Sequence, residues 1–271
     1  MSTALVLAGG GVTGIAWEIG VLLGLAENGN DLVDRADLVI GTSAGSTVGA
    51  QVTLGRALGD LYAAQLSDDH GEISPRLDLD LLARIFGSMT DGGTSSDGER
   101  KLIGEMALAA STVDQPTRRA VIEKRIGSDS WPARPLLITA IDADTGAFRT
   151  WSRDDGISLI DAVASSCAVP GVWPCVQIGG ARYYDGGLRN SANAFLAAGH
   201  DEVWVLAPLT GGASPAVEHE MNDLRAAGAR VTFVTADETA VGAMGPNSLD
   251  PRFRPAAAEN GLRQGRAFGR G

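Results

Sequence analysis

Short apolar runs alternate with stretches of helical spacing at the start of the chain. Ala4–Leu7 is an apolar run that leads into Gly9–Gly11, and apolar residues then recur at helical spacing over Gly14–Asn28. Leu38–Ile40 is a second apolar run, and it leads into Gly41–Gly45 and another helical stretch. A strand, a tight turn and a helix, repeated in this way, predict a parallel sheet with crossover helices.

Residues 56–130 show a different pattern, with helical spacing and no convincing strand. The polar, glycine-rich stretch Thr90–Gly98 is typical of a loop. We therefore expect a helical layer or lid, inserted over one end of the sheet. The helices expected in this region are Leu58–Leu66, Leu79–Phe86, Glu99–Ala110 and Thr117–Ile126.

Strand patterns return at Leu136 and alternate again with helical segments, near Ser191–Ala198 and Ala216–Ala227. The whole pattern predicts an α/β fold with a mainly parallel sheet. For 271 residues we expect a single domain over 1–271, with a peripheral tail over about 245–271 that forms at most one fraying helix. The strands expected here are Leu136–Ile141, Phe148–Trp151, Val176–Ile178, Ala181–Tyr184, Val203–Ala207 and Val231–Val234.

The net charge of −11 and the pI near 4.7 argue against binding of nucleic acid. Two cysteines, Cys167 and Cys175, are too few for a disulfide framework, and without nearby histidines they make a poor metal site. The N-terminus lacks the basic segment and the cleavage site of a signal peptide, and we identify no transmembrane stretch. We therefore expect a cytoplasmic protein.

Gly41–Gly45 matches G-x-S-x-G, the pattern of a nucleophile elbow, in which a serine lies on a sharp turn between a strand and a helix. Glycines at Gly41 and Gly45 relieve collisions in such a turn. The helix from Ala44 directs free N–H groups toward whatever Ser43 attacks. The alternative is a turn whose serine merely caps the helix. The strand–turn–helix context favours the nucleophile.

Gly9–Gly14 also fits G-x-G-x-x-G, the pattern of a dinucleotide site. That site needs an acidic residue after the second strand, and Ile40–Ser43 contains no carboxylate. Consecutive glycine N–H groups can instead bind an oxyanion, and the nearby serine favours this interpretation. A purely structural turn needs only one glycine. Gly9, Gly10 and Gly11 are therefore the candidate oxyanion hole.

A nucleophilic serine needs a base, which is either a histidine or a carboxylate with a raised pKa. Asp185 follows a strand in Tyr184–Gly187, although Asp-Gly is also a frequent turn pair. The order Ser43, Asp185 and then His200 or His219 formally allows a Ser–Asp–His triad. His200 is more typical of a helix end and His219 of an exposed helix face, so the triad is disfavoured.

Four blocks together carry a resemblance to a known family. Gly9–Gly14, Gly41–Gly45, Ser165–Pro170 and Asp185–Gly187 occur in the order and spacing of the patatin-like phospholipase family. Each block alone is common, but the combination is specific, and it covers residues 9–187, about two thirds of the chain. The sequence thus resembles a patatin-like serine acyl hydrolase.

The resemblance implies a three-layer α/β/α fold and hydrolysis of lipid acyl esters by a Ser–Asp dyad, without a metal or an organic cofactor. In this sequence Ser43 would be the nucleophile, Asp185 the base, and the N–H groups around Gly10 and Gly11 the oxyanion hole. Ser165–Pro170 would pack beneath the site. The implied partner is a lipid or another acyl ester, which allows transient contact with a membrane surface.

Thr13 departs from the family pattern, which usually has a basic residue immediately before Gly14. With Thr13 and a net charge of −11, a strongly anionic head group is a less attractive substrate than a neutral ester or a zwitterionic phospholipid. Two other functions stay open, an acyltransferase that uses the same acyl-Ser43 and a non-catalytic lipid- or nucleotide-binding module. The missing acid after Ile40 argues against a nucleotide.

Overall fold

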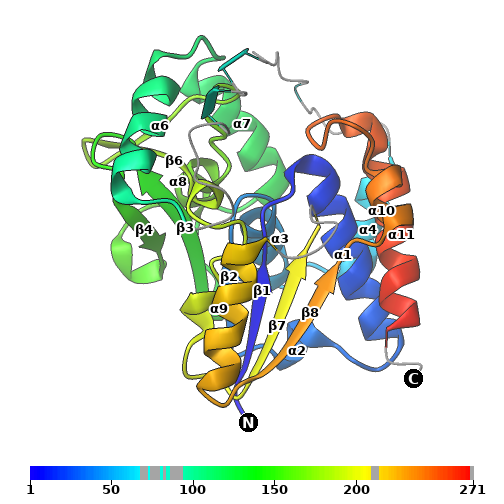
Figure 1. The fold of residues 1–271 in the computed structure, drawn as a ribbon. Helices are drawn as coiled ribbons and strands as arrows, with labels where there is room; N and C mark the ends of the chain where they lie inside the picture. The colour runs from blue at the N-terminus through cyan, green and yellow to red at the C-terminus, as the bar shows by residue number, and fades with distance from the viewer. Residues whose placement is uncertain (68–72, 74–79, 82–83, 86–93, 209–213, 269–271) are drawn as a thin grey trace.

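The computed structural model describes residues 1–67, 73, 80–81, 84–85, 94–208 and 214–268. The strands in this part of the chain are β1 (Thr3–Leu7), β2 (Leu38–Gly41), β3 (Leu136–Asp142), β4 (Phe148–Trp151), β5 (Val176–Ile178), β6 (Ala181–Asp185), β7 (Glu202–Ala207) and β8 (Arg230–Thr235). They form one sheet in the order β5-β6-β3-β2-β1-β7-β8, and β4 also pairs with β3 (Figure 1). Neighbouring strands from β3 to β8 in this order are parallel, whereas β4 and β6 run antiparallel to β3.

Helices cover both faces of this sheet (Figure 1). The α-helices are α1 (Gly11–Glu27), α2 (Leu32–Arg35), α3 (Ala44–Thr53), α4 (Leu58–Leu66), α6 (Asp97–Ala109), α7 (Gln115–Ile126), α8 (Leu159–Ser166), α9 (Pro215–Ala226), α10 (Glu238–Ala243) and α11 (Arg254–Ala267). Short 3₁₀ helices are η1 (Arg153–Asp155), η2 (Gly186–Leu188), η3 (Ala194–Ala197) and η4 (Pro251–Phe253).

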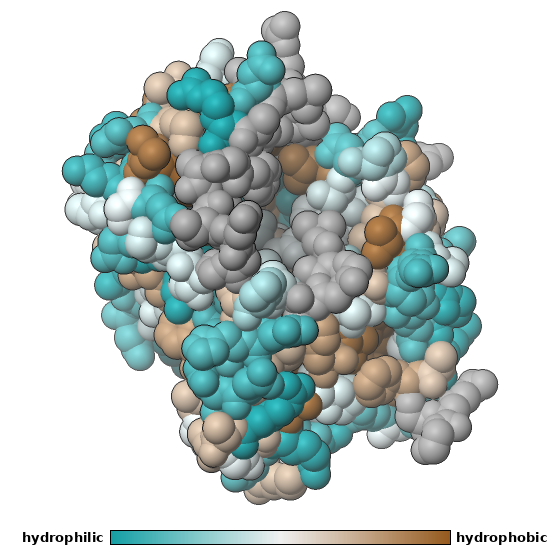
Figure 2. All heavy atoms as spheres, in the orientation of Figure 1, coloured by the Kyte–Doolittle hydropathy of each residue, from teal (hydrophilic) through white to brown (hydrophobic). Residues whose placement is uncertain are grey.

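Two hydrophobic cores lie on opposite faces of the central strand β1. Leu5 and Leu7 belong to the core that includes residues of α1, α3 and α8. Ala4 and Val6 belong to the second core, with residues of η3 and α9. Successive side chains of a strand point to opposite faces, so a strand that is apolar at every position requires cover on both sides. The outer surface of α9 is hydrophilic (Figure 2). The predicted three-layer α/β/α arrangement is confirmed.

The helical region over 56–130 is divided between two parts of the molecule. Helix α4 packs against α1 and α11, whereas α6 contacts β3 and α7 contacts α3 and α8 (Figure 1). Four of the eight residues of Leu79–Phe86 and four of the nine residues of Thr90–Gly98 lie outside the described residues. The expected helix over Ser191–Ala198 is reduced to η3, because Asn193 has a left-handed backbone with φ of 52° that a right-handed helix cannot include.

The C-terminal segment is not a peripheral tail. It forms α11, which packs along α1 so closely that glycines are required on both helices. A Cβ atom on Gly24 would lie 2.6 Å from the carbonyl oxygen of Leu262, and one on Gly261 would collide with the carbonyl oxygen of Trp17. The Trp17 indole N–H also donates to Gln264 Oε1 at 2.7 Å. Small residues one turn apart on each helix therefore allow the backbones to touch.

We expect Gly261→Ala to destabilise the protein, because the added methyl group forces α11 away from the α1 backbone. Overpacking of this kind lowers the free energy of unfolding by about 1–3 kcal/mol. Gly59→Ala in α4 is the matched control, since a Cβ atom added to Gly59 would have no other atom within 4 Å. Because alanine favours helix, the control should be neutral or stabilising by up to about 1 kcal/mol. Urea unfolding measures both, and equal effects would contradict the close packing.

Candidate active site

Ser43 lies on a strained turn between β2 and α3. Its backbone has φ of 52° and ψ of −113°, a conformation that residues other than glycine rarely adopt. A Cβ atom on Gly45 would collide with the Leu7 carbonyl of β1, and one on Gly41 would lie 2.5 Å from the Ser46 Cα. Both glycines are therefore required where the start of α3 crosses the strand ends. The turn has the geometry of a nucleophile elbow.

Hydrogen bonds from α8 and α3 hold the Ser43 peptide units in place. The Ser43 N–H donates to Ser166 Oγ at 2.9 Å. The Ser43 carbonyl accepts from Ser46 Oγ at 2.6 Å and from the Cys167 thiol at 3.2 Å. Ser166 and Cys167 belong to the block Ser165–Pro170, which thus contacts the elbow directly. Burial, and then the Asp185 charge, raise the pKa of the Cys167 thiol, so it stays protonated and can donate.

Asp185 reaches the elbow through the register of the sheet. β2 pairs with β3 from Leu136 to Ile138, and β6 pairs with β3 from Ala140 to Asp142. Asp185 is the last residue of β6 and lies opposite Ala140, two positions beyond the β3 residue that faces Gly41. The Ser43 side chain lies close enough to the Asp185 carboxyl group to lower its pKa. Two residues that are far apart in the sequence therefore meet at the ends of adjoining strands.

The environment of Asp185 changes its acidity. The side chain is almost completely buried, and this burial raises its pKa from 3.8 to about 7. The Ser43 side chain and the Gly187 N–H, which donates to Oδ1 at 2.8 Å, both lower the pKa and only partly offset the burial. An aspartate with an ordinary pKa is a weak base, whereas one with a pKa near 7 can take a proton at neutral pH.

The glycine loop supplies fewer donors than the sequence suggests. The Gly9 N–H donates to the Ser191 carbonyl at 2.9 Å, so Gly9 is not available as an oxyanion donor. The N–H groups of Gly10 and Gly11 have no acceptor among the described residues. Gly11 begins α1 with φ of 64° and lines a cavity together with Ser43. Gly10 and Gly11 therefore stay candidates for this role, at the positive end of a helix dipole.

The cavity at Ser43 is small, with a volume of about 20 Å³. A space of this size holds about one water molecule and no acyl chain. Its walls include Arg118 and Trp173, whose guanidinium and indole groups stack at 3.8 Å, and Leu249. With these side chains in place, the acyl chain of a substrate does not fit in this cavity.

A polar network that the sequence patterns do not predict connects the two strand ends. Asn193 Nδ2 donates to Thr42 Oγ1 at 3.1 Å and to the Gly186 carbonyl at 3.3 Å. Thr42 Oγ1 also accepts from Thr139 Oγ1 at 2.9 Å. Asn193 is fully buried, and it joins the residue before Ser43 to the residue after Asp185. Its left-handed backbone, which asparagine tolerates, aims the amide at both.

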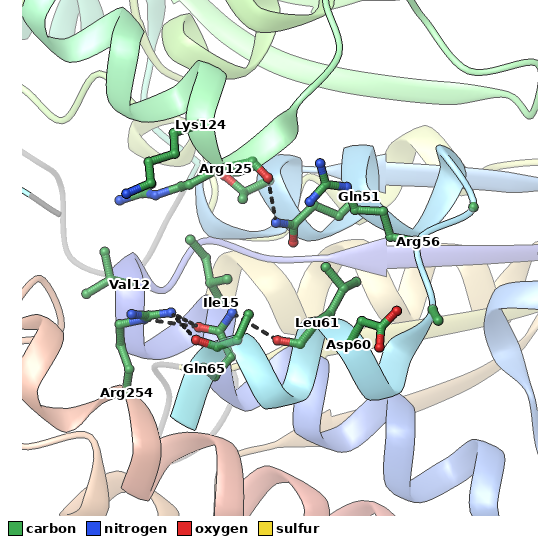
Figure 3. A pocket seen from close by; sticks show the side chains of 14 residues that line it. Val12, Ile15, Gln51, Arg56, Asp60, Leu61, Gln65, Lys124, Arg125 and Arg254 are labelled. Atoms are coloured by element: carbon green, nitrogen blue, oxygen red, sulfur yellow. Dashed lines mark hydrogen bonds between the residues drawn. The ribbon is translucent and has the colours of Figure 1, made fainter. Parts of the chain in front are cut away.

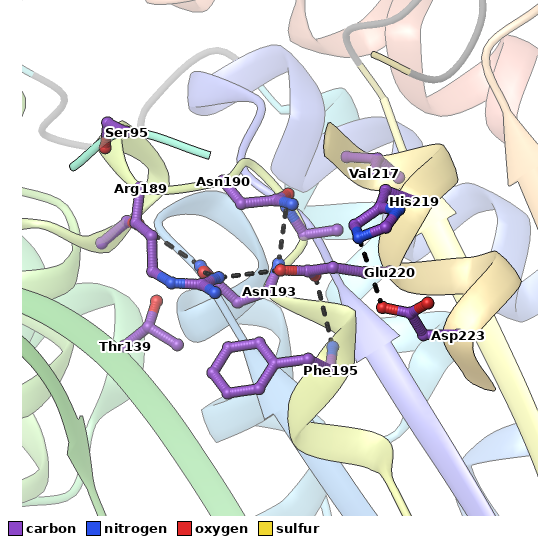
Figure 4. A network of polar contacts seen from close by, with 12 residues as sticks. Ser95, Thr139, Arg189, Asn190, Asn193, Phe195, Val217, His219, Glu220 and Asp223 are labelled. Atoms are coloured by element: carbon purple, nitrogen blue, oxygen red, sulfur yellow. Dashed lines mark hydrogen bonds and ion pairs between the residues drawn. The ribbon is translucent and has the colours of Figure 1, made fainter. Parts of the chain in front are cut away.

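Arg189, directly after η2, holds Asn193 in turn and is paired with Glu220 of α9 (Figure 4). The Arg189 guanidinium donates to Asn193 Oδ1 at 2.9 Å and to Glu220 Oε1 at 2.8 Å. The same guanidinium lies over the rings of Phe148 and Phe195, at 5.0 and 4.2 Å from their centres. Because Arg189 and Glu220 are largely buried, this ion pair constrains geometry more than an exposed pair does.

No histidine of the described residues contacts Ser43 or Asp185. His200 Nδ1 lies 3.1 Å from the Ala197 carbonyl, and His219 lies 3.6 Å from Asp223 on the exposed face of α9. His70 lies outside the described residues. Over the same part of the chain, no group of three or more His, Cys, Asp or Glu residues is arranged to hold a metal ion. None of the described helices has the length and apolarity to cross a membrane.

The fold and the elbow place the chain among α/β proteins with a serine at a strand–turn–helix junction. The sequence model of the family described as patatin-like phospholipase matches residues 5–198. The chain therefore belongs to the patatin-like phospholipase family, as the resemblance implied. The matched range contains Ser43 and Asp185 and ends before α9. No curated protein sequence matches the chain.

Two bacterial proteins of known structure are similar to the chain. The crystal structure of VipD from Legionella pneumophila matches with a TM-score of 0.50 at 14% identity, over 97% of this chain and 66% of VipD. ExoU from the type III secretion system of Pseudomonas aeruginosa, solved in complex with SpcU, matches with a TM-score of 0.38 at 17% identity. That match covers 97% of this chain and 52% of ExoU. The likeness to VipD shows a shared fold.

We expect Asn193→Ala to lower the free energy of unfolding by about 2 kcal/mol or more, because it leaves buried polar groups unsatisfied. Alanine also tolerates the left-handed backbone less well than asparagine does. Asn222→Ala is the control, since Asn222 is exposed on α9 and accepts only from Arg225; it should change stability by less than about 0.5 kcal/mol. Urea unfolding compares the two. A fully stable Asn193→Ala protein would show that the network does not hold the strand ends.

Proposed function

We propose that this protein is a serine acyl-ester hydrolase that acts on lipids. The observation that carries the proposal is the position of Ser43, on its strained turn, beside the buried Asp185, whose pKa is raised to about 7. The family supplies the substrate class, since its members are described as patatin-like phospholipases. Lipid acyl esters are therefore the substrates that we infer.

In the first half of the reaction, Ser43 Oγ attacks the ester carbonyl while Asp185 takes the hydroxyl proton. The carbonyl oxygen becomes an oxyanion, and the N–H groups of Gly10 and Gly11 donate to it. The N-terminus of α3 stabilises the same negative charge. Asp185 then gives its proton to the leaving alcohol as the bond from that alcohol to the acyl carbon breaks. The product is an acyl ester of Ser43.

In the second half, water attacks the acyl carbon of the Ser43 ester while Asp185 accepts a proton from that water. The bond from Ser43 Oγ to the acyl carbon breaks, Oγ regains its proton from Asp185, and a fatty acid leaves. A donor held at the position of the oxyanion typically accelerates such steps by about 100-fold or more. If an alcohol attacks this intermediate in place of water, the acyl group passes from Ser43 to the alcohol, and the reaction is an acyl transfer.

We expect a fluorophosphonate probe to label the wild-type protein and neither Ser43→Ala nor Asp185→Asn, because labelling needs both the nucleophile and its base. Mass spectrometry after digestion identifies the labelled residue. Hydrolysis of a neutral acyl ester should fall by about 1,000-fold or more in Ser43→Ala, while circular dichroism shows an intact fold.

His200→Ala is the matched control, and it should label like wild type. Labelling that survives Asp185→Asn but is lost in His200→Ala would show that His200, and not Asp185, is the base. Full esterase activity in Ser43→Ala would overturn the proposal. Product analysis with added alcohol separates hydrolysis from transfer, since transfer yields more new ester than free acid.

The raised pKa of Asp185 predicts the pH dependence of the reaction. The carboxylate must be deprotonated to act as a base, so kcat/KM should rise about tenfold per pH unit below pH 7 and level off above it. The free energy of unfolding should depend on pH in the opposite direction and decrease as the pH rises. Because the folded pKa exceeds the unfolded value of 3.8, the contribution of Asp185 is present at low pH and is lost as pH rises through about 7.

Asp185→Asn removes this loss, so its stability relative to wild type should grow from pH 4 to pH 8. Thermal unfolding of both proteins across this range tests the prediction independently of activity. A difference that does not change with pH would contradict the raised pKa.

A further inference from the structure

Glu18 is a buried acid that has no part in the proposed reaction. It lies in the middle of α1 and is 0% exposed, and neither of its carboxyl oxygens has a hydrogen-bond partner among the described residues. Burial raises the pKa of this carboxyl group well above its ordinary value, and the Ala8 backbone offsets only part of the effect. Because an unpartnered buried polar group costs free energy, its presence needs a reason other than stability.

Neighbouring charges do not account for the raised pKa. The same side of α1 carries Gly14, which packs between the start of α3 and the residue after β7. β1 and α3 carry no charged residue, and β7 carries only Glu202, at its first position. None of the described charged side chains contributes to the pKa of Glu18. The charges on α4 and α11, which also pack along α1, are Asp60, Arg254, Glu259, Arg263 and Arg266.

Glu18 lies beside the residue that joins the glycine loop to the elbow. Its carboxyl group is close enough to the Ala8 backbone for that backbone to lower its pKa. The Ala8 carbonyl accepts from the Gly45 N–H at 3.1 Å, and the Ala8 N–H donates to the Leu206 carbonyl at 3.0 Å. Ala8 thus connects β1 to α3 and β7 immediately before the glycine loop, Gly9–Gly11.

The same helix carries the candidate oxyanion donors. α1 begins at Gly11, about two turns before Glu18, and the Gly14 N–H donates to the Gly10 carbonyl at 2.9 Å. Packed helices shift as units of about 1–2 Å rather than residue by residue. A shift of α1 at Glu18 therefore carries Gly10 and Gly11 with it.

A cavity of about 580 Å³ near Glu18 leaves room for such a shift. It lies between α3, α4, α7 and the start of α11, and Val12 and Ile15 of α1 line it (Figure 3). Ile15 is three positions before Glu18, so the two are neighbours on the helix surface. Polar side chains such as Gln51 and Gln65 form other parts of its wall (Figure 3). A polar cavity of this size holds water, which an ionised carboxylate requires.

We propose that Glu18 is a positioning residue whose neutral carboxyl group keeps α1 and the glycine loop against the elbow, and whose ionisation releases them. This inference rests on the proposed hydrolase function, since Gly10 and Gly11 are the candidate oxyanion donors of that reaction. On ionisation the proton passes to the solvent, and a carboxylate without a partner stays in the core. Such a charge is far more costly to bury than the neutral acid, so α1 shifts until the carboxylate meets water. The donors then leave the oxyanion, and activity falls at alkaline pH.

The test is the dependence of kcat/KM on pH for a neutral acyl ester, from about pH 6 to about pH 10, with the rate of Ser43→Ala subtracted. Glu18→Gln has the size of the neutral acid and cannot ionise. Glu27→Gln is the control, because Glu27 is an exposed residue of the same helix. Beyond the plateau that Asp185 predicts, kcat/KM of the wild type and of the control should fall about tenfold per pH unit, whereas Glu18→Gln should stay on the plateau.

An alkaline fall that Glu18→Gln leaves unchanged would belong to another group, such as the Cys167 thiol, and would overturn the proposal. A wild-type plateau that extends to about pH 10 would also overturn it. Circular dichroism checks the fold of Glu18→Gln, and Glu18→Met is a second variant without an ionisable group.

Hydrogen exchange separates this inference from the hydrolase function. In Ser43→Ala protein, the amides of the first turns of α1 should exchange about tenfold faster at about pH 9 than in the same protein with Glu18→Gln, and equally fast at about pH 6. Equal exchange at both pH values would overturn the release of α1. Loss of all Ser43-dependent hydrolysis with this difference retained would overturn the hydrolase function but not the release of α1.

Discussion

Ser43 holds a backbone conformation that costs a non-glycine residue roughly 1–3 kcal/mol, so the surrounding structure must keep it in place. Gly45 allows the start of α3 to lie against Leu7 of β1, which prevents the turn from relaxing in that direction. Ser166 and Cys167, more than 120 positions away in the sequence, bond to the N–H and the carbonyl of Ser43. Three separate parts of the chain thus meet at one residue, and the geometry of the candidate site depends on all three.

The electrostatics of the site follow from the same convergence. The register of β3 brings Asp185 to the elbow in a place that water hardly reaches, and burial raises the pKa of its carboxyl group. Burial also raises the pKa of the Cys167 thiol, and the Asp185 charge adds to this effect. Ionisation of one acid therefore disfavours ionisation of the other. The thiol stays a donor to the Ser43 carbonyl, and in the proposed mechanism the carboxylate is the group that exchanges a proton with the serine hydroxyl.

The local sequence was sufficient to predict the strand, turn and helix around Ser43, because the three elements are consecutive and each has its own pattern. Asp185 needed the resemblance to a family, since an Asp-Gly pair alone equally predicts a turn. Neither route could find Asn193, whose amide bonds to Thr42, 151 positions away. The error at Gly9 has the same origin, because the acceptor of its N–H, the Ser191 carbonyl, comes from a distant loop. Patterns along the chain predict elements, whereas partners of single polar atoms depend on tertiary packing.

The position of α11 follows from backbone packing against α1 that its composition does not reveal. The arginine-bearing C-terminal segment has the composition of a solvated tail, because nothing in its sequence indicates a partner. Its glycines nevertheless fit the backbone of α1, and Arg254 at its start donates to Gln65 of α4. Arg254 lies outside residues 5–198, the range that the family shares. Helix α11 thus adds to α1 and α4 a set of contacts that lie outside the family pattern.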